Sequence, residues 1–290
     1  MPTSPDLEEA DAAPLSTPSN PGSAVRLDPR TILITGASSG IGRALATSYA
    51  QRGTTLILIG RDAQRLAESA AECRALGATV EAAAIDVRNI ETLRAFILSM
   101  DDRHSIDLVI ANAGVSAVLS QGEIIESPET TTSIFEINVF GVVNLVQAVV
   151  PRMCARGKGQ IALMGSMAAL RGLPYAPAYC ATKSAVHLYA ESLRPSLGKH
   201  GVSVALIIPG FVHTPFNARL SSPKPLAFSA GRAAAIIRRG LQEGKREIVF
   251  PRLLYLLIRA GSLLPGRLVD ALLNRIPVEA PPMPTPPPGT

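Results

Sequence analysis

The chain has 290 residues, of which 47% are hydrophobic, and its net charge is only +5, so it can bury the core of one large domain. Nine basic residues and three acidic residues lie between Arg232 and Arg275, but the leucines between them and the lack of aromatic stacking residues argue against nucleic-acid binding. The three cysteines lack metal-ligand spacing, so we expect reduced thiols and no metal. The sequence shows no signal-peptide pattern and no run of 18 apolar residues, so we expect a cytoplasmic protein.

The N-terminal part of the chain combines a polar tail with a glycine-rich turn. Residues 1–28 are rich in Pro, Ser, Ala and acids, which predicts disorder. A buried strand at 31–34 then leads into the glycine-rich segment 35–42, and an apolar periodic segment follows at 41–52. This order suits a pyrophosphate site, because glycines let the backbone approach closely and a helix N-terminus presents N–H groups. Glycines also occur in ordinary turns, so the cluster gains its meaning from this context.

Strands and helices alternate along the rest of the chain. Asp62 is the expected N-cap of a helix that stops at Gly77. The alternation predicts an α/β fold, a doubly wound parallel sheet of the Rossmann type, as a single domain over 29–250. Further strands are expected at 54–59, 79–85, 106–111, 160–164, 202–208 and 247–250, and further helices at 62–76, 90–100, 130–156 and 178–198.

Two residues of the 178–198 helix form the centre of the predicted site. Tyr179 and Lys183 are four residues apart, so their side chains share one helix face. A cation beside a phenol favours the phenolate and brings the hydroxyl closer to acid/base work at neutral pH. Ser166 follows a buried strand, at the end of a parallel sheet where ligands bind. The alternative for the pair is two unrelated helix residues.

Taken together, these residues resemble the short-chain dehydrogenase/reductase family. The resemblance covers residues 30–216 and implies an enzyme that transfers a hydride between a nicotinamide cofactor and a carbonyl or secondary alcohol. The matches, which occur in the family's order, are Thr35-Gly36-Ala37-Ser38-Ser39-Gly40-Ile41-Gly42, Asp86-Val87, Asn112-Ala113-Gly114, Asn138, Ser166, Tyr179, Lys183 and Pro209-Gly210.

The resemblance implies roles for four catalytic residues. Tyr179 would be the general acid in reduction and the base in oxidation, and Ser166 would hydrogen-bond the substrate oxygen. Lys183 would lower the pKa of Tyr179 and hold the nicotinamide ribose. Asn138 would anchor a water that passes protons to Lys183, although an Asn within a helix can also mark a kink.

The family's cofactor-binding positions carry over onto the same motifs. Asp86 matches the adenine-binding acid, although it could instead cap the following helix. Thr214 is placed to touch the nicotinamide carboxamide, although Thr214-Pro215 could be only a helix start. The expected set is Gly36, Ser38, Ser39, Gly40, Ile41, Gly42, Arg61, Asp86, Val87, Asn112, Ala113, Gly114, Tyr179, Lys183, Pro209, Gly210, Val212 and Thr214.

The choice of cofactor depends on the end of the second strand. Relatives that prefer NAD place a carboxylate there, which accepts a hydrogen bond from the ribose 2′-OH and repels a 2′-phosphate. Here Gly60 removes that repulsion, and Arg61 offers a bidentate partner for the phosphate. We therefore expect NADP(H) rather than NAD(H). The alternative is that Arg61 is solvated and Asp62 binds the ribose.

The C-terminal region is expected to shape substrate specificity. A substrate lid is predicted at about 215–235, and a Pro-rich unstructured tail at 278–290. Between them, residues 251–277 form an extension in which leucines and arginines recur, and Pro265-Gly266 breaks it into two short amphipathic helices. The extension either contacts an anionic membrane surface or packs on the substrate pocket or a subunit interface.

The sequence thus predicts an NADPH-dependent oxidoreductase acting on an apolar or lipid-like carbonyl or alcohol, as a homo-oligomer. The alternatives are an NAD-dependent alcohol dehydrogenase of the same family and a catalytically silent nucleotide-binding protein. A silent relative would be expected to lack Tyr179 or Lys183, and both are present. Among nearby residues, Tyr175 is expected to line the pocket, whereas His187 and Cys180 are interpreted as packing residues.

Overall fold

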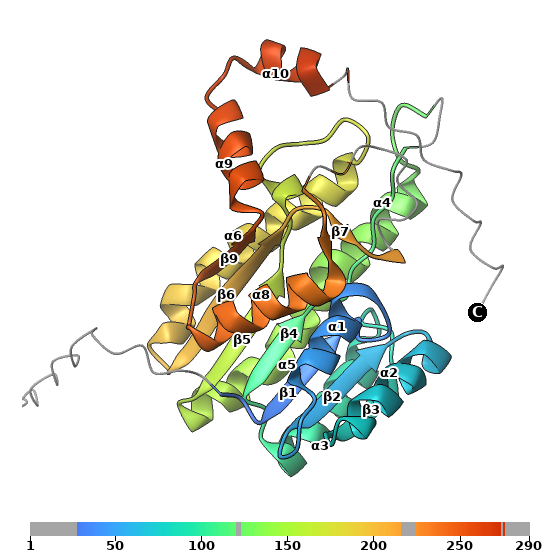
Figure 1. Cartoon of the computed structure of the whole chain (residues 1–290), viewed down its shortest axis with the longest axis vertical. Coiled ribbons are helices and arrows are strands. Elements are labelled where there is room, and N and C mark those ends of the chain that lie inside the picture. Colours follow the sequence, from blue (N-terminus) through green and yellow to red (C-terminus); the bar gives the residue numbers. More distant parts are fainter. Residues whose placement is uncertain (1–27, 120–122, 216–223, 225, 274, 276–290) are drawn as a thin grey trace, which may run out of the picture.

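Seven parallel strands form one sheet in the order β3-β2-β1-β4-β5-β6-β9 (Figure 1). The computed structural model describes residues 28–119, 123–215, 224, 226–273 and 275. The strands are β1 Thr31–Thr35, β2 Thr55–Gly60, β3 Thr79–Ala84, β4 Leu108–Ala111, β5 Gly159–Met164, β6 Val202–Pro209 and β9 Glu247–Phe250, and a separate short pair joins β7 Val212–His213 to β8 Phe228–Ser229.

Helices cover both faces of the sheet. Helices α1, α2 and α8 pack on one face through residues such as Leu45, Leu66 and Ile237, and α3, α5 and α6 pack on the other. The helices are α1 Gly40–Tyr49, α2 Ala63–Ala75, α3 Ile90–His104, α4 Pro128–Phe135, α5 Gly141–Arg156, α6 Pro177–Gly198, α8 Ala230–Gln242, α9 Arg252–Gly261 and α10 Gly266–Leu273, with a π-helical segment at Glu136–Phe140 and a 3₁₀ turn at Met167–Ala169.

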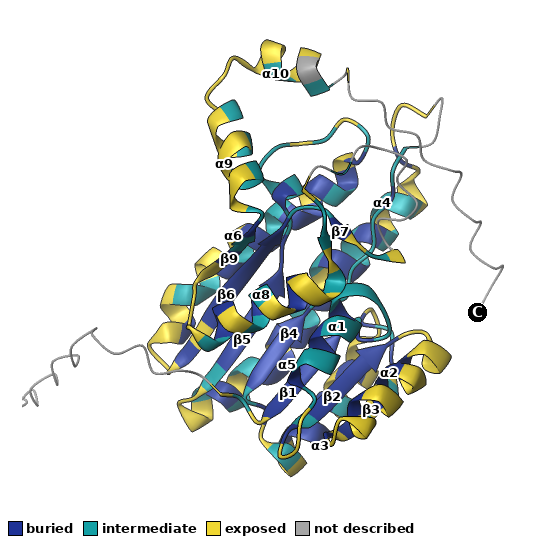
Figure 2. Ribbon diagram, in the orientation of Figure 1, coloured by how far each residue is buried: buried dark blue, intermediate teal, exposed yellow. Residues whose placement is uncertain are grey.

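The central strands are buried along their whole length because both of their faces are covered. All five residues of β1 and all four of β4 are buried (Figure 2). Continuous apolar runs of this kind are typical of parallel sheets between two helix layers. The predicted doubly wound α/β fold is therefore confirmed.

The position of β1 decides where the sheet can bind a ligand. Strand β1 pairs with β2 on one side and with β4 on the other. The strand order therefore reverses at β1: β2 and β3 extend the sheet in one direction, and β4, β5, β6 and β9 extend it in the other. The connections after β1 and β4 leave the sheet on opposite faces, and a crevice forms between them at the carboxyl ends of the strands.

The structure differs from the predicted elements at several positions, of which the longest extension of a predicted helix is that of α3, which runs to His104 rather than to residue 100. The predicted helix 130–156 is α4 and α5 joined by the π-helical segment, and it begins at Pro128. Strand β4 begins at Leu108, two residues after its predicted start, because the amide of Ile106 donates to the carboxylate of Asp101 instead of a neighbouring strand. Helix α8 was not predicted, although Ser229 caps it through the amide of Arg232.

Parts of the predicted segments fall outside the described residues. These are residues 1–27 of the N-terminal tail, the 216–223 portion and residue 225 of the lid, residues 274, 276 and 277 of the extension, and the Pro-rich tail 278–290. From Ala230 the lid segment is the first part of α8, where Ala233 and Ala234 are buried. The two helices predicted in the extension are α9 and α10, with Pro265 and Gly266 at their junction.

The helical run 128–156 is long and apolar enough, by composition, to cross a membrane, and among the described residues it alone meets that test. Half of its most apolar window is buried inside the fold. Residues Leu145 and Val149 of this run belong to the core between the sheet and α3. Burial of this kind is what a core helix shows.

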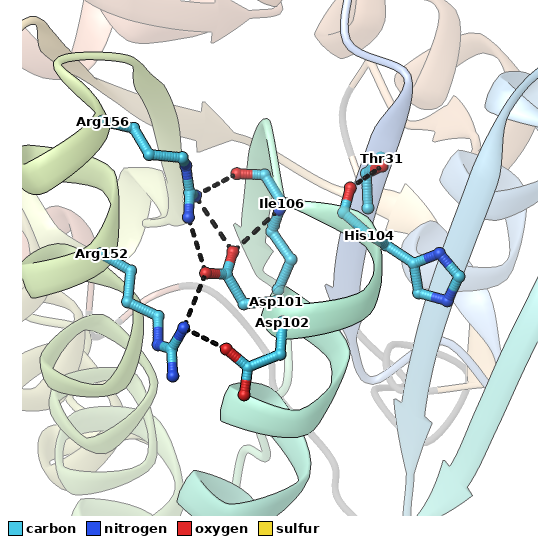
Figure 3. A network of polar contacts seen from close by, with 7 residues as sticks. All are labelled: Thr31, Asp101, Asp102, His104, Ile106, Arg152 and Arg156. Atoms are coloured by element: carbon cyan, nitrogen blue, oxygen red, sulfur yellow. Dashed lines mark hydrogen bonds and ion pairs between the residues drawn. The ribbon is translucent and has the colours of Figure 1, made fainter.

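A partly buried ion pair ties α3 to α5 at the end of the sheet opposite the crevice (Figure 3). The Asp101 carboxylate accepts hydrogen bonds from Arg156 Nη1 at 2.6 Å and Nη2 at 3.0 Å, and from the Ile106 amide at 2.9 Å. Arg156 also donates to the Ile106 carbonyl at 3.1 Å. The network satisfies backbone groups just before β4 begins and so fixes the start of that strand.

Replacing Asp101 with Asn should therefore destabilise the fold by about 2 kcal/mol, because Arg156 loses its buried charge partner. The cost is below that of a fully buried pair because the Arg156 side chain keeps 31% exposure. Urea unfolding monitored by circular dichroism measures it. Asp102→Asn is the matched control, since Asp102 is exposed and, among the described residues, forms an ion pair with Arg152 alone. Equal losses in the two variants would contradict this account.

Candidate active site

A cavity of about 1080 Å³ lies at the crevice end of the sheet. Its walls come from the turn after β1, the ends of β2 and β3, the segments after β4, β5 and β6, helix α6, and helices α9 and α10. All of the predicted site residues line it except Gly42 and Asn138, which lie directly behind its wall. Residues predicted from motifs far apart in the sequence are thus brought to one place.

The turn after β1 requires glycine at two positions. Gly36 has φ +68°, and a Cβ there would lie 2.9 Å from the Cα of Ala113. A Cβ at Gly42 would lie 2.1 Å from the carbonyl oxygen of Gly36, so Gly42 lets α1 pack onto the turn. Ser39, the N-cap of α1, makes no side-chain capping hydrogen bond. The first amides of α1 therefore face the cavity mouth as donors for an anion.

The loop after β4 is fastened to this turn. The side-chain amide of Asn112 donates to the carbonyls of Thr35 at 3.0 Å and Gly36 at 3.3 Å. The backbone amides of Asn112 and Ala113 both donate to the Thr35 hydroxyl at 3.1 Å. These bonds make 112–114 more than a plain turn, because they hold two walls of the cavity at a fixed separation.

Asp86 and Arg61 meet at the ends of β3 and β2. Burial raises the pKa of the Asp86 carboxyl, but its hydrogen bonds with the side chain and backbone of Arg88 outweigh this and lower it overall. Arg61 Nη1 lies 4.0 Å from Asp86 Oδ2, and the Arg61 side chain is exposed at the cavity edge. Helix α3 is capped by Asn89, which accepts from the amide of Thr92, so Asp86 is not that helix's cap.

Asp62 is the N-cap of α2, so its carboxylate is already hydrogen-bonded. Its carboxylate accepts from the Arg65 amide at 3.0 Å and lies 3.4 Å from Arg65 Nε. Gly60 packs against Ser38, since a Cβ at position 60 would lie 3.2 Å from the Ser38 hydroxyl. Two arginines, 61 and 65, thus line this edge of the cavity, and the carboxylate between them in the sequence, Asp62, is already used as a cap.

Ser166 and Tyr179 come together where β5 ends and α6 begins. Ser166 Oγ accepts from the amide of Ala168 at 3.1 Å, which holds its side chain in place. The Tyr179 hydroxyl is hydrogen-bonded to Ser166. Both residues line the cavity, so the two hydroxyls present a pair of hydrogen-bonding groups to one bound oxygen atom.

Lys183 lies one helical turn after Tyr179 and is buried. Its Nζ donates to the Met164 carbonyl at 2.9 Å and is 5.8 Å from the centroid of the Tyr179 ring. Burial lowers the pKa of Lys183 to about 8. The ammonium is therefore the main form at neutral pH, but with less margin than an exposed lysine has.

Burial raises the pKa of Tyr179 to about 12, with the hydrogen bond to Ser166 acting in the opposite direction. The lowering that we expected from Lys183 is thus smaller than the cost of placing a phenolate among apolar neighbours. The phenol is the form present at neutral pH. An uncharged phenol suits the donation of a proton to a substrate oxygen.

Asn138 is fully buried and connects three parts of the site. Its Nδ2 donates to the Val115 carbonyl at 2.8 Å and the Thr182 hydroxyl at 3.1 Å, and its Oδ1 accepts from the Val115 amide at 2.8 Å. It sits in the π-helical segment, where the helix widens by one residue. Such segments occur often at functional sites. A Cβ at Gly114 would lie 3.2 Å from Asn138 Oδ1 and 3.6 Å from Lys183 Nζ.

His187 contacts Ser166, although the sequence had suggested only a packing role for it. Its Nε2 accepts a hydrogen bond from the Ser166 amide at 3.3 Å, and a Cβ at Gly165 would lie 2.4 Å from the same nitrogen. Burial lowers the pKa of His187 to about 4, helped by the charge of Lys183. Tyr179, Lys183 and His187 are spaced by four, which is the signal that could have placed all three on one face of α6.

The segment after β6 forms a further part of the cavity wall. Pro209, Gly210, Val212 and Thr214 all line it. A Cβ at Gly40 would lie 3.1 Å from Thr214 Cγ2, so Thr214 lies against the start of α1. This contact places the segment next to the anion-binding turn.

Helices α9 and α10 form the outer wall. They extend beyond the end of the sheet at which β9 ends (Figure 1). Arg171 Nη2 lies 2.5 Å from Asp270 Oδ1, which ties α10 to the segment after β5. Tyr175 also lines the cavity, as expected. The lining residues from the two helices include Leu254, Ile258, Val269 and Leu273.

The sequence matches known proteins over most of its length. The short chain dehydrogenase family matches residues 30–225. An uncharacterized oxidoreductase of Myxococcus xanthus is 35% identical over 248 residues, which cover 85% of this chain and 97% of that protein. Human 17-beta-hydroxysteroid dehydrogenase 13 is 30% identical over 249 residues, which cover 84% of this chain and 82% of that protein.

Solved structures agree. A short-chain dehydrogenase from Sphingobium yanoikuyae in complex with NADPH superposes with a TM-score of 0.70 at 28% identity, over 85% of this chain and 96% of that chain. A short chain dehydrogenase from Mycobacterium paratuberculosis bound to NAD gives a TM-score of 0.67 at 26% identity, over 75% and 94%. The turn after β1 has no room for side chains at Gly36 and Gly42, so a ligand can approach its backbone closely. This turn and the first amides of α1 suit the pyrophosphate of such a cofactor. The chain belongs to the short-chain dehydrogenase/reductase family and is a nicotinamide-dependent oxidoreductase.

Proposed function

We propose that the protein is an NADPH-dependent reductase of apolar or lipid-like ketones and aldehydes, and that it oxidises the corresponding alcohols in reverse. The observation that carries this proposal is the hydrogen-bonded pair Ser166 and Tyr179, with Lys183 beside it, in the same cavity as the glycine turn. Binding, proton transfer and charge stabilisation can then act on one substrate oxygen.

Each residue has one task in this reaction. The cofactor, when bound, supplies the hydride in reduction. The Tyr179 hydroxyl donates the proton to the substrate oxygen, and the Ser166 hydroxyl donates a hydrogen bond to the same oxygen. Lys183 holds a positive charge beside Tyr179 and offers N–H donors to ribose hydroxyls. His187 positions Ser166 by accepting a hydrogen bond from its amide, and Asn138 holds Thr182, the residue before Lys183, through its side-chain amide.

NADPH is favoured over NADH by the charges at the end of β2. Arg61 and Arg65 lie at the cavity edge, and the carboxylate of Asp62 is occupied as the cap of α2. A 2′-phosphate would meet two guanidinium groups there, whereas a ribose 2′-OH would find no unengaged carboxylate at residues 60–62.

Replacing Arg61 with Asp should therefore reverse the cofactor preference. We expect kcat/KM with NADPH to fall about 100-fold relative to that with NADH, because one phosphate contact is lost and a repulsive charge is gained. Initial rates with both cofactors measure the ratio.

Arg94→Asp is the matched control, because Arg94 is exposed on α3 and does not line the cavity. It makes the same change of charge far from the cofactor. An unchanged NADPH/NADH ratio in Arg61→Asp would remove the argument for NADPH and favour the NAD-dependent alternative.

The residues of the outer cavity wall support the proposal of an apolar substrate. Leucines, an isoleucine and a valine from α9 and α10 line the part of the cavity that those helices add. The similar human protein is named as a hydroxysteroid dehydrogenase, which acts on an apolar substrate by its name. A larger apolar wall binds larger apolar molecules, at about 25 cal/mol per Å² buried.

The direct test is the decay of NADPH absorbance with a panel of carbonyl compounds that differ in chain length. We expect measurable reduction, with kcat/KM rising as the apolar part of the substrate grows. No decay with any carbonyl compound, together with tight binding of NADPH, would favour a catalytically silent nucleotide-binding protein instead.

Assembly and location also remain proposals. We propose a homo-oligomer that pairs through α5 and α6, the helices that relatives often use. The exposed Phe140, next to α5, and the exposed Leu188 on α6 support this surface. The cytoplasmic location stays a prediction from the sequence, with Cys73, Cys154 and Cys180 as free thiols.

A further inference from the structure

We infer that α9 and α10 dock the protein on an anionic lipid bilayer with their outer face, while their inner face walls the cavity. The two helices and their junction, residues 252–273, are called the hairpin here. The sequence presented pocket packing and membrane contact as alternatives. In the structure the two uses fall largely on different faces of the same helices, so one does not exclude the other. Leu257 lies at the boundary between the faces, since it lines the cavity and is 59% exposed.

The inner face is already occupied by the fold. Leu254, Tyr255 and Ile258 are partly buried and pack against the core beneath α9. Val269 and Leu273 of α10 line the cavity. These positions recur every three or four residues, as expected for one face of a helix.

The outer face is apolar and exposed. Leu253 and Leu256 on α9 are about three-fifths exposed, Leu264 is 55% exposed, and Leu263, between the helices, is 87% exposed. Leu268 on α10 is 62% exposed. Figure 2 draws much of α9 and α10 in the colour of exposed residues. A helix that is apolar on both its buried and its exposed faces needs a partner for the second face.

The charge of the hairpin selects an anionic partner. Arg252, Arg259 and Arg267 are exposed, and Asp270 is the acid in the described part of the hairpin. Asp270 is paired with Arg171, so it does not offset the arginines of the outer face. Exposed leucines flanked by arginines match the boundary between acyl chains and anionic headgroups, where apolar area and positive charge are both favourable.

A second copy of this chain is the competing occupant. Two hairpins placed face to face would bring arginines from both copies together with no unpaired acid in the described hairpin to receive them. A bilayer with anionic headgroups receives both the leucines and the arginines. Docking also places the cavity wall at the lipid surface, where an apolar substrate is concentrated. Only this last step depends on the proposed function.

The test is flotation of the full-length protein with vesicles of phosphatidylcholine alone or mixed with phosphatidylglycerol. We expect the wild type to float with the mixed vesicles, much less with phosphatidylcholine alone, and less as salt is added. The double variant Leu256→Glu/Leu263→Glu should lower the partition coefficient at least about tenfold. Arg259→Gln and Arg267→Gln should each lower it about fivefold on the mixed vesicles.

Matched controls separate docking from general effects. Leu76→Glu changes an exposed leucine at the end of α2, and Arg94→Gln changes an exposed arginine on α3, both outside the cavity lining. Both should float like the wild type. Thermal unfolding and reduction of a water-soluble carbonyl compound check that the hairpin variants remain folded.

Two results would overturn the inference. One is flotation of Leu256→Glu/Leu263→Glu equal to that of the wild type. The other is sedimentation showing that this variant converts a wild-type dimer into monomers, since the outer face would then be covered by a second copy. A wild type that floats but reduces no carbonyl compound would count against the proposed reaction and leave the docking supported.

Discussion

Replacing Tyr179 with Phe should lower kcat/KM for carbonyl reduction by about 100-fold to 10,000-fold, the usual contribution of a positioned general acid. The substitution removes one hydroxyl and keeps the ring beside Lys183. We expect NADPH affinity, measured by fluorescence titration, to change by less than about threefold, because the phosphate-binding donors come from the turn after β1 and the start of α1, which the substitution leaves unchanged.

Tyr189→Phe is the matched control for this prediction. Tyr189 lies on the same helix, and burial raises its pKa too, but it is outside the cavity lining. The control should keep its rate within about twofold. A Tyr179→Phe enzyme that kept most of its activity would show that another group, such as a water held by Ser166, donates the proton.

Replacing Lys183 with Met should remove most of the activity and yet raise the stability of the fold at neutral pH. Burial holds the pKa of Lys183 at about 8, against 10.5 for an ordinary lysine. The unfolded chain therefore binds the proton more tightly than the folded chain does. At pH 7 the buried ammonium costs about 3 kcal/mol, offset in part by about 1 kcal/mol from its hydrogen bond to Met164.

The sign of the pH dependence follows from the same shift. Between pH 8 and 10.5 the folded chain has released a proton that the unfolded chain still holds, so wild-type stability rises with pH across this window. The stability gained by Lys183→Met should thus be about 2 kcal/mol at pH 7 and should shrink toward pH 10. Urea unfolding of the cofactor-free proteins at several pH values measures it.

Lys199→Met, at the exposed end of α6, is the control and should change neither activity nor the pH dependence of stability. A Lys183→Met protein less stable than the wild type at pH 7 would mean that the ammonium finds more favourable contacts in the fold than its pKa indicates. Its kcat/KM for reduction should fall at least about 100-fold, because the positive charge beside Tyr179 is lost.

Local sequence predicted the sheet because its strands carry unambiguous signals. The runs that became β1 and β5 are continuous and apolar, since both faces of each strand are covered. Asp62 and Gly77 marked the ends of α2 for stereochemical reasons that act within a few residues. Helix α8 was missed although its apolar residues recur with clear helical periodicity, because its first residues were assigned to the predicted lid that follows Pro223 and Pro225.

The sequence by itself determined which groups this protein places at its site: the glycine turn, Ser166, Tyr179 and Lys183 are chemical types at fixed spacings, and spacing along a helix or strand is a local property. Only the tertiary structure decided how those groups behave. The pKa of Tyr179, the bond from Ser166 to His187 and the division of the hairpin into a cavity face and an exposed face all depend on which neighbours exclude water. Burial is a property of the packed chain, so no stretch of sequence read alone contains it.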